Sequence, residues 1–554
     1  MLTRLLGLET EYVLRFTPKR RQKHPGNRVL YEAVIAAVRQ RVSTVKPSFI
    51  DPDETEFLAN GGAVSFESRT YDSGRRGLVE GATPEHVSPS TVLLYQHAMD
   101  RLLSDAAFVA ERQLGRDGVR GELRLIKNCR DGQGEVYGVQ ENLEVAMASG
   151  LLLGLWRVGW AVLLPLVAVW AAVSIVLVFS LVPAVLLIAG FTWLLTGGAV
   201  SRCWEWFKEG LGIRLANGLE LVLSLFPGQL VVWLLWVCAF RPLRRDAIGF
   251  LVSRCLITGA GTLQRDGEFL LSEKGPAVTG VCRSTILPGD RAIFDTGNLF
   301  SSAFSVFTFK LAPMFRLFRR RQRMQLGLAD ANLCHVAEYL KIGLTALVVD
   351  AAEAGALRGL PRPRSPVAAL HTWMRDPMES VPTRVGWRGV GPKIDAFAMQ
   401  RQVLARVEEW VKEHSAPAKE AGELLRLWHE VLGLLENELG ALVGQLDWVT
   451  KYWLLGRTGH SKPWAMRKKI DLRYHELDSG YLARLSGAGL CSRLTTDDEV
   501  ARAVVEPPEA GPARVRASFV RDLSRCNRRV TMSWEDVKIG RGPAAKIYRF
   551  DDFR

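Results

Sequence analysis

The chain has 554 residues with 72 Lys+Arg against 58 Asp+Glu, giving a formal net charge of +14. This length exceeds one small domain, and 48% hydrophobic with 23% charged residues argues against a disordered chain. The positive charge suits an anionic partner, a class that includes nucleic acid, anionic lipid, nucleotides and acidic proteins. The eight cysteines include no C-x-x-C pair, which argues against a zinc finger or a disulfide framework.

The first 148 residues alternate short strand-like runs with turn signals. Strands are expected over Thr3–Phe16, Gly62–Phe66 and Leu123–Lys127, and Thr91–Leu114 has the periodicity of an amphipathic helix. An acidic residue at position 9 and the lack of a long apolar core argue against a secretory signal at the start of the chain. We therefore expect a mixed α and β region that lies in the cytoplasm.

A long apolar run follows this region. Val158–Val200 contains no charged residue and is long enough to cross a bilayer about twice. A break at Ser180–Pro183 predicts a hairpin with spans over 158–178 and 181–200. The basic flanks, Arg157 and Arg202, place both ends in the cytoplasm by the positive-inside rule. The alternative is a buried core helix, which rarely has this length.

A third apolar stretch, Leu219–Phe240, contains Pro227 and Gly228 and has basic residues at both ends. We favour a re-entrant or interfacial segment here over a third full span. Beyond it, a helix is expected over Val336–Ala354, two packed helices within 395–455, and a turn at Glu506–Glu509.

The first chemical motif pairs two acids on one strand. In Gly7-Leu-Glu9-Thr-Glu11-Tyr12, the period of two points Glu9 and Glu11 to the same face. Such carboxylates repel unless a cation bridges them, and Mg²⁺ takes oxygen ligands and also binds nucleotide phosphates. Two ordinary acids on a solvent-facing strand are the alternative.

Further acids and amides lie at the ends of strand-like runs beside glycine turns. They include Glu67 in Asn60–Glu67, Glu80 and Glu85, and the segments Lys127–Gly134 and Tyr137–Asn142. A metal and phosphate site needs such groups. The sequence contains no Walker A motif, G-x-G-x-x-G, G-x-S-x-G or H-E-x-x-H, so the common nucleotide, hydrolase and zinc-protease classes lack support.

In this order, the motifs resemble the Pup ligase and Pup deamidase (depupylase) family, of the carboxylate-amine ligase superfamily. The landmarks are Gly7–Tyr12, Asn60–Glu67, Glu80–Glu85, Lys127–Asn142, Phe250–Gly261, Asp330–Leu333 with Tyr339–Leu347, Asp447–Val449, Lys469–His475, and Leu494–Glu499 leading to Arg514–Arg516. The resemblance covers most of the chain outside the apolar run, which looks like an insert between Asn142 and Phe250.

The resemblance implies an α+β fold: a glutamine-synthetase-like curved antiparallel sheet with helices, interrupted by an α-helical transmembrane insert, plus a small C-terminal domain. The expected organisation is a first part of the catalytic domain (1–148), the insert (149–245), a second part with a helical region (246–468) and the C-terminal domain (469–554). It also implies a catalytic unit on the cytoplasmic side of the bacterial inner membrane.

The resemblance also implies roles for single residues, with ATP and Mg²⁺ as cofactors. Glu67 stands where the family has its catalytic aspartate, to accept a proton from the attacking lysine amine in a ligase, or to act in hydrolysis in a deamidase. The implied metal ligands are Glu9, Glu11, Glu80 and Glu141. The other residues expected to line the nucleotide and substrate groove are Glu85, Asn128, Arg254, Asp330, Asn332 and Arg516.

The implied reaction joins the C-terminal side-chain carboxylate of a modifier to a substrate lysine through an acyl phosphate. The expected partners are a small, acidic, disordered, Pup-like modifier, lysine-bearing proteins and membrane lipids, and not nucleic acid. Ile293–Phe300 lacks the arginine, two acids and histidine that the family has there, and Gln140 and His335 also depart from it. A deamidase or isopeptidase of the same fold, and an inactive membrane receptor for nucleotide or modifier, therefore stay open.

Three further predictions give residues a purely structural role. His335 is expected to be a satisfied core histidine, and Cys334 to be buried and unreactive. The tryptophans at 410, 428 and 448 have helical spacing and are expected in the core.

Overall fold

The computed structural model describes residues 2–19, 22–45, 54–67, 77–132, 134–195, 228–282, 291–305, 312–375, 382–384, 392–414, 419–459, 462–524, 530–540 and 545–550. The fold is α+β, as expected, and it divides into two compact units. The first unit comprises Met1–Glu144, Pro242–Val278 and Gln325–Arg554, and the second comprises Val145–Arg241 and Thr279–Met324. Most of the predicted insert, 149–245, therefore lies in the second unit, which also takes in a later segment. The predicted C-terminal domain, 469–554, lies in the first unit.

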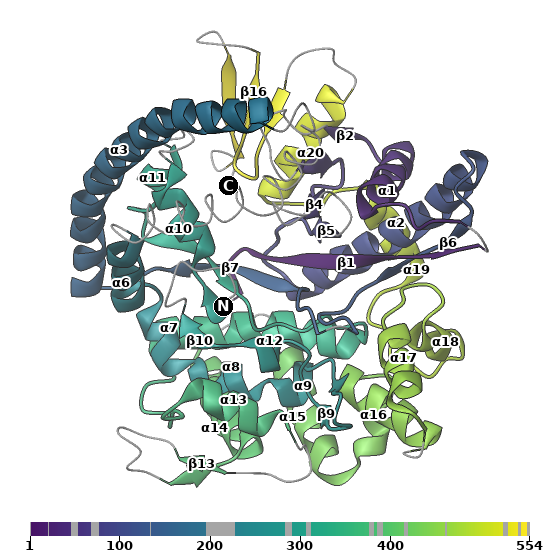
Figure 1. Cartoon of the computed structure of the whole chain (residues 1–554). Helices are drawn as coiled ribbons and strands as arrows, with labels where there is room; N and C mark the ends of the chain where they lie inside the picture. Colours follow the sequence, from purple (N-terminus) through teal and green to yellow (C-terminus); the bar gives the residue numbers. More distant parts are fainter. Residues whose placement is uncertain are drawn as a thin grey trace. The chain divides into compact units, whose positions relative to one another are not determined.

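The sheet of the first unit is antiparallel and is built around one long strand, β1 (Figure 1). The strands run in the order β7-β1-β5-β4-β3-β2, and β6 pairs with the second half of β1. Their bounds are Leu6–Pro18 (β1), Thr44–Val45 (β2), Glu56–Leu58 (β3), Ala63–Glu67 (β4), Leu78–Ala82 (β5), Gly121–Ile126 (β6) and Gln140–Ala146 (β7). The strands predicted from period-two patterning at β1, β4 and β6 are confirmed.

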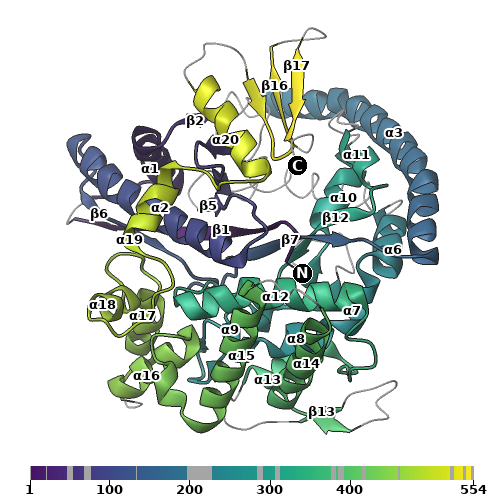
Figure 2. The ribbon, with the colours of Figure 1, turned by 180° about the vertical axis from the view of Figure 1, so that it is seen from behind.

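Two helices, α1 (Asn27–Arg41) and α2 (Pro89–Arg116), cover one face of this sheet (Figures 1 and 2). Tyr12, Leu14 and Phe16 of β1 are buried in the core that these helices form with the sheet. The Ser88 side chain caps α2 by accepting a hydrogen bond from the backbone N–H of Thr91, which confirms the helix predicted there. Because side chains alternate along β1, Glu9 and Glu11 lie on the opposite face.

Most of the other helices of the first unit lie between residues 241 and 487 of the chain. Their bounds are Arg241–Asp246 (α7), Ile248–Ser253 (α8), Cys255–Thr258 (α9), His335–Ala354 (α12), Pro366–Trp373 (α13), Ala396–Lys412 (α14), Lys419–Asn437 (α15), Asp447–Thr458 (α16), Trp464–Tyr474 (α17) and Tyr481–Gly487 (α18). Short 3₁₀ helices span Gly275–Ala277 (η2) and Leu439–Leu442 (η5), and short hairpins are formed by Thr262–Leu263 (β8) with Phe269–Leu270 (β9) and by Thr383–Arg384 (β13) with Lys393–Ile394 (β14). The helix predicted at α12 is confirmed, as are the packed helices α14 and α15 and the buried Trp410, Trp428 and Trp448.

The end of the chain adds two helices and a three-stranded sheet. Their bounds are Asp497–Val505 (α19), Pro512–Leu523 (α20), Val530–Met532 (β15), Asp536–Ile539 (β16) and Lys546–Arg549 (β17). A capping box between Thr496 and Glu499 fixes the start of α19. The predicted turn at Glu506–Glu509 connects α19 and α20.

The second unit contains the apolar run. Its elements are Leu151–Leu195 (α3), Gly228–Cys238 (α6), Gly280–Cys282 (β10), Ala292–Asp295 (β11), Gly297–Ala303 (α10), Ala312–Arg316 (α11) and Arg321–Leu326 (β12), of which β12 extends past the unit boundary. The predicted break at Ser180–Pro183 is wrong, because α3 is continuous through it. The proline removes one backbone donor without ending the helix. β10 and β11 pair in parallel, so the strands are not all antiparallel as predicted.

One stretch among the described residues, Leu151–Trp170, is long and apolar enough to cross a membrane. It is 28% buried, whereas the core helix of a globular unit that passes the same test is mostly buried. Length and composition of one such helix are weak evidence for a span. The predicted segment 196–200 and the part of the third apolar stretch before Gly228 lie outside the described residues.

Candidate active site

Three acids from neighbouring strands lie on the face of the first unit's sheet that does not pack against α1 and α2. In the antiparallel register, Glu11 of β1 is opposite Glu80 of β5, and Glu80 is opposite Ser65 of β4. Directly opposed residues share a face, and Glu67 follows Ser65 by two positions, so it points the same way. The sheet therefore brings Glu11, Glu67 and Glu80 together from positions far apart in the sequence.

The three side chains form one cluster of oxygen donors. One carboxylate oxygen from each of Glu11, Glu67 and Glu80 lies within 4.8 Å of the other two. Glu11 is buried, Glu80 is half-buried and Glu67 is exposed. Carboxylate oxygens at this spacing suit a hard divalent cation such as Mg²⁺, so the residues present fit the metal that the sequence implied. Because Glu67 is accessible from outside, a substrate can reach the cluster.

The electrostatics of Glu11 reflect this crowding. Burial, together with the neighbouring charge of Glu67, raises the pKa of Glu11 to about 8, and the charge of Lys274 opposes the rise. The backbone N–H of Gly138 donates to Glu11 Oε2 at 2.9 Å and holds the carboxyl in place. At neutral pH the Glu11 carboxyl thus holds a proton that a bound cation would displace.

Glu9 lies two residues before Glu11 on the same strand face, but it is not part of the three-acid cluster. Its Oε2 accepts a hydrogen bond from Gln325 Nε2 at 3.1 Å. Opposite Glu9 in the register stands Gln140. Glu9 and Gln140 therefore extend the polar face beside the cluster.

Glu141 and Arg254 pair with each other away from the cluster. Glu141 is opposite Leu8, so it points to the face that does not carry Glu9 and Glu11. Its Oε1 lies 2.6 Å from Arg254 Nη2, and both side chains are buried. Arg254 also donates to Thr345 Oγ1 at 2.7 Å. The structure therefore does not bring Glu141 to the predicted metal ligands, and the charge of Arg254 is already neutralised.

Half-buried Glu85 and buried Arg516 form a second ion pair. Arg516 is fully buried and donates to both oxygens of the Glu85 carboxylate, at 2.9 and 2.5 Å. It also donates to the carbonyl of Gly61 at 2.6 Å and stacks on the ring of Trp534. The pair therefore fixes α20 to the β3–β4 turn and to the segment after β5. The predicted phosphate or acidic-group contact of Arg516 is occupied by a carboxylate of the chain itself.

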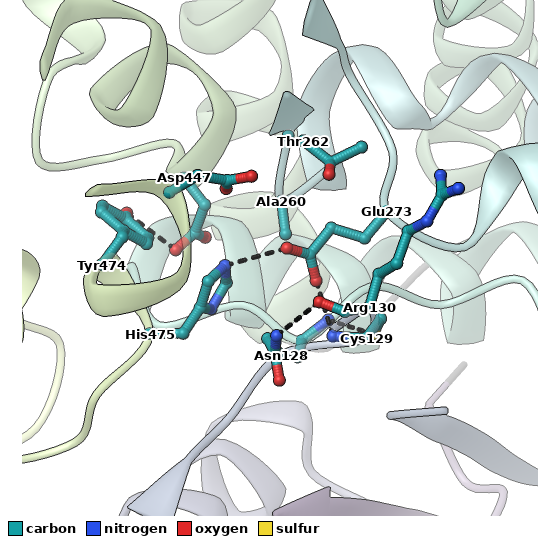
Figure 3. Close-up of polar contacts among 12 residues, drawn as sticks. Asn128, Cys129, Arg130, Ala260, Thr262, Glu273, Asp447, Tyr474 and His475 are labelled. Atoms are coloured by element: carbon teal, nitrogen blue, oxygen red, sulfur yellow. Dashed lines mark hydrogen bonds and ion pairs between the residues drawn. The ribbon is translucent and has the colours of Figure 1, made fainter. Parts of the chain in front are cut away.

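Asn128, Asp330 and Asn332 all lie in buried turns. Asn128 donates to the carbonyl of Arg130 at 2.7 Å (Figure 3). The Asp330 carboxylate accepts backbone N–H bonds from Ala260 and Glu273, at 2.9 and 3.0 Å. Asn332 donates to Asp447 at 2.9 Å. These contacts hold loops together, and they leave the three side chains little freedom to contact a ligand.

Glu273 lies at the centre of a buried polar network that the sequence did not predict. Glu273 Oε1 lies 3.2 Å from His475 Nε2, and its Oε2 accepts the N–H of Cys129 at 2.6 Å (Figure 3). The same Oε1 lies 3.0 Å from Lys451 Nζ. Burial alone would raise the pKa of Glu273, but the charges of Lys451 and His475 hold it well below its ordinary value. Lys451 also pairs with Asp471 at 2.7 Å. The only sequence signal was the motif that ends at His475, because the partners lie far apart along the chain.

The expectation for Cys334 agrees with the structure, whereas His335 has hydrogen-bond and ring partners but is half-buried and not in the core. The His335 ring stacks on His97 with centroids 3.9 Å apart, and its Nδ1 accepts the N–H of Leu494. Burial lowers the pKa of His335 to about 4, so its ring is neutral. Cys334 is buried, and burial raises the pKa of its thiol well above the ordinary value.

The comparisons with known proteins cover nearly the whole chain. Residues 4–538 match the family described as Pup-ligase protein. The Pup--protein ligase of Acidimicrobium ferrooxidans is 25% identical over 97% of this chain and 92% of its own length. That of Mycolicibacterium smegmatis is 23% identical over 100% and 97%.

Two solved structures share the fold. One is the complex between the prokaryotic ubiquitin-like protein Pup and its ligase PafA, with a TM-score of 0.68 and 18% identity over 100% of this chain and 92% of that chain. The other is PafA in complex with ADP, with a TM-score of 0.62 and 18% identity over 90% and 86%. Since the family match spans almost all of the sequence, the chain belongs to the Pup-ligase family.

Proposed function

We propose that this protein is an ATP-dependent ligase that joins the C-terminal side-chain carboxylate of a Pup-like modifier to a lysine amine of a target protein. The observation that carries the proposal is the cluster of Glu11, Glu67 and Glu80 on one sheet face, in a chain of the Pup-ligase family. The relatives named Pup--protein ligase and the PafA structures with Pup and with ADP support the same substrates. The net charge of +14 suits an acidic modifier.

The reaction has two steps. An oxygen of the modifier carboxylate attacks the terminal phosphorus of ATP, which forms an acyl phosphate and releases ADP. The lysine nitrogen then attacks the acyl carbon, the bond to phosphate breaks, and the amine loses a proton. A divalent cation, when bound, supplies positive charge beside the phosphate oxygens.

The residues of the cluster have different tasks in this proposal. Buried Glu11 and half-buried Glu80 would hold the cation, because they are fixed on neighbouring strands. Exposed Glu67 would accept the proton of the lysine amine, because it alone of the three is open to solvent. Glu9 would orient ligands beside the cluster, with Gln325 holding its carboxylate.

One departure from the family resemblance motivates two alternative functions, a deamidase and a receptor. The segment Ile293–Phe300 falls on β11 and α10 of the second unit, and it lacks the charged residues that the family resemblance predicts there. A deamidase of the same fold would use the same cluster to hydrolyse a C-terminal glutamine side chain. A protein without turnover would bind nucleotide or modifier only.

The experiment that separates these outcomes supplies ATP, Mg²⁺ and a modifier ending in Glu or in Gln, with Glu67→Ala as the control. The ligase account expects ADP release with the Glu form and its loss in the variant. Ammonia release from the Gln form would assign a deamidase instead. Binding of Mg–ATP without either product would assign a receptor and contradict both enzyme accounts.

We also propose that the second unit contacts lipid at the cytoplasmic side of the bacterial inner membrane. Val158, Val162 and Val169 of α3 and Trp233 and Trp236 of α6 are all exposed. Large apolar side chains exposed along two helices suit an interaction surface. The basic segment Arg319–Arg321 of the same unit suits anionic headgroups.

The geometry limits how α3 meets the bilayer. Its 45 residues correspond to about 68 Å of helix, roughly twice the 30 Å hydrocarbon core. We therefore propose that α3 lies against the membrane along part of its length, instead of crossing as the predicted hairpin. Flotation with vesicles of anionic phospholipid tests this. Val162→Glu with Val169→Glu should reduce co-flotation at least tenfold, and unchanged flotation would exclude the α3 surface as the contact.

A further inference from the structure

Lys274 is a buried cation beside the acid cluster. Its residue is 5% exposed, and it lies between Glu273 and the short helix η2. The backbone N–H of Lys274 donates to Asp330 Oδ1 at 3.0 Å, which fixes the start of the side chain. The position of the ammonium is therefore set by the fold and not by solvent.

The ammonium differs from the other buried lysines of the described residues. Lys127, Lys341, Lys451 and Lys468 each have a carboxylate oxygen within 3.0 Å. Lys274 forms no ion pair with any residue that the structure describes, and the bond of its Nζ is to the carbonyl of Val139, at 2.6 Å. An ammonium has three hydrogens to donate, so two remain for another acceptor. A buried ammonium with no carboxylate in ion-pair contact is costly, and a purely structural role does not explain it.

The neighbours of Lys274 connect it to the cluster. Val139, which accepts from its Nζ, directly follows Gly138, whose N–H binds Glu11 Oε2 at 2.9 Å. The charge of Lys274 also acts on the Glu11 carboxyl. A fixed cation thus lies beside a carboxylate that is suited to hold a second cation. A cation bound at the cluster and the Lys274 ammonium would repel each other unless an anionic oxygen lay between them.

We propose that the Lys274 ammonium binds an anionic oxygen of the group that reacts at the Glu11–Glu67–Glu80 cluster. That oxygen belongs either to the terminal phosphoryl group of a nucleoside triphosphate or to the carboxylate that the triphosphate activates. The inference rests on the proposed function and adds a residue that contacts the substrate.

The test compares Lys274→Met and Lys274→Arg with the wild type. Calorimetric titrations use Mg²⁺ alone, Mg–ADP, Mg²⁺ with a non-hydrolysable ATP analogue, and a peptide of the modifier's C-terminus. Lys274→Met should bind Mg²⁺ alone as tightly as the wild type or more tightly, because a nearby positive charge is removed. It should bind either the ATP analogue or the peptide about tenfold or more weakly, since it loses a charge-assisted hydrogen bond. Lys274→Arg should retain most of that affinity.

The two possible ligands are distinguished by which affinity falls. Loss for the ATP analogue with Mg–ADP unchanged assigns the terminal phosphoryl group, and loss for the peptide assigns the carboxylate. Wild-type affinity of Lys274→Met for both would overturn the inference. If the wild type itself binds no Mg–nucleotide, the proposed function fails, which is a different result.

Thermal unfolding of the apoprotein separates a ligand contact from a structural role. Lys274→Met should melt at the wild-type temperature or above it, because an unpaired buried charge is replaced by an apolar side chain. The matched control is Lys341→Met, which should melt lower because it leaves Glu338 buried without its 3.0 Å partner. A Lys274→Met variant that melts as low as the control would overturn the inference.

Discussion

Glu11 on β1 lies directly opposite Glu80 on β5, so the sheet holds two carboxylates side by side on one face. Glu67 of β4 adds a third oxygen donor within 4.8 Å. Burial and the charge of Glu67 keep a proton on the Glu11 carboxyl at neutral pH. A bound cation would replace that proton, and this exchange is the physical basis of the proposed site.

Replacing one of the opposed acids tests its part in binding the cation. Glu80→Gln should weaken Mg²⁺ binding at least tenfold, because the cluster loses one of its three carboxylates. The variant should therefore also be stabilised less by Mg²⁺ than the wild type is. Chemical denaturation with and without Mg²⁺ measures this effect. A Glu80→Gln variant that binds Mg²⁺ as tightly as the wild type would contradict the cluster.

The pKa of Glu11 predicts how stability depends on pH. Its pKa is about 8 in the folded protein against an ordinary value of 4.5. Between these values the folded state holds a proton that the unfolded state has lost. The free energy of unfolding of the metal-free protein should therefore fall as pH rises, by up to about 1.4 kcal/mol per pH unit from this group.

Mg²⁺ should reverse the trend, because it competes with that proton. Its stabilising effect should grow from pH 6 to pH 8, and Glu11→Gln should remove both the slope and the metal effect. Thermal melts across this pH range, with Mg²⁺ or with a chelator, measure the difference. An equal Mg²⁺ shift at all pH values would contradict the assignment of Glu11.

The buried pair of Glu141 and Arg254 should behave as a structural element. Arg254→Met leaves the Glu141 carboxylate buried without its 2.6 Å partner and should cost about 3–5 kcal/mol of stability. Arg254→Met combined with Glu141→Leu should recover much of the loss, because no unpaired charge remains. Urea unfolding of both variants checks this. A direct metal role for Glu141 would instead appear as weaker Mg²⁺ binding by Glu141→Gln.

Arg516 should resist conservative replacement. Its guanidinium forks onto the Glu85 carboxylate and stacks on Trp534, and a lysine can do neither in the same geometry. Arg516→Lys is expected to lose about 2–4 kcal/mol of stability. Mg–ADP affinity, measured well below the melting temperature, should change less than threefold. A large loss of nucleotide affinity in a stable variant would contradict this structural role and support the phosphate contact predicted for Arg516.

Local sequence patterns predicted the strands and which of their side chains share a face. They did not predict the side-chain partners that lie far away in the sequence. Period-two alternation placed Glu9 and Glu11 on one face, because the strand repeat is a local property. The partner of Arg254 and the isolation of Lys274 depend on strand register and on segments more than 100 residues away. The same holds for Arg516, which meets Glu85 across most of the chain. In α3, Pro183 was predicted to lie in a break between two spans, but it lies within a continuous helix.

Conjugate formation tests the central claim most directly. Wild-type protein, Glu67→Asp and Glu67→Gln are incubated with ATP, Mg²⁺, a Pup-like modifier ending in Glu and a lysine-bearing target, and the isopeptide product is quantified by mass spectrometry. The account predicts product with the wild type, a partial rate with Glu67→Asp and a loss of about 10²-fold or more with Glu67→Gln, because the amide cannot accept the amine proton. Conjugate formed at the wild-type rate by Glu67→Gln would contradict it.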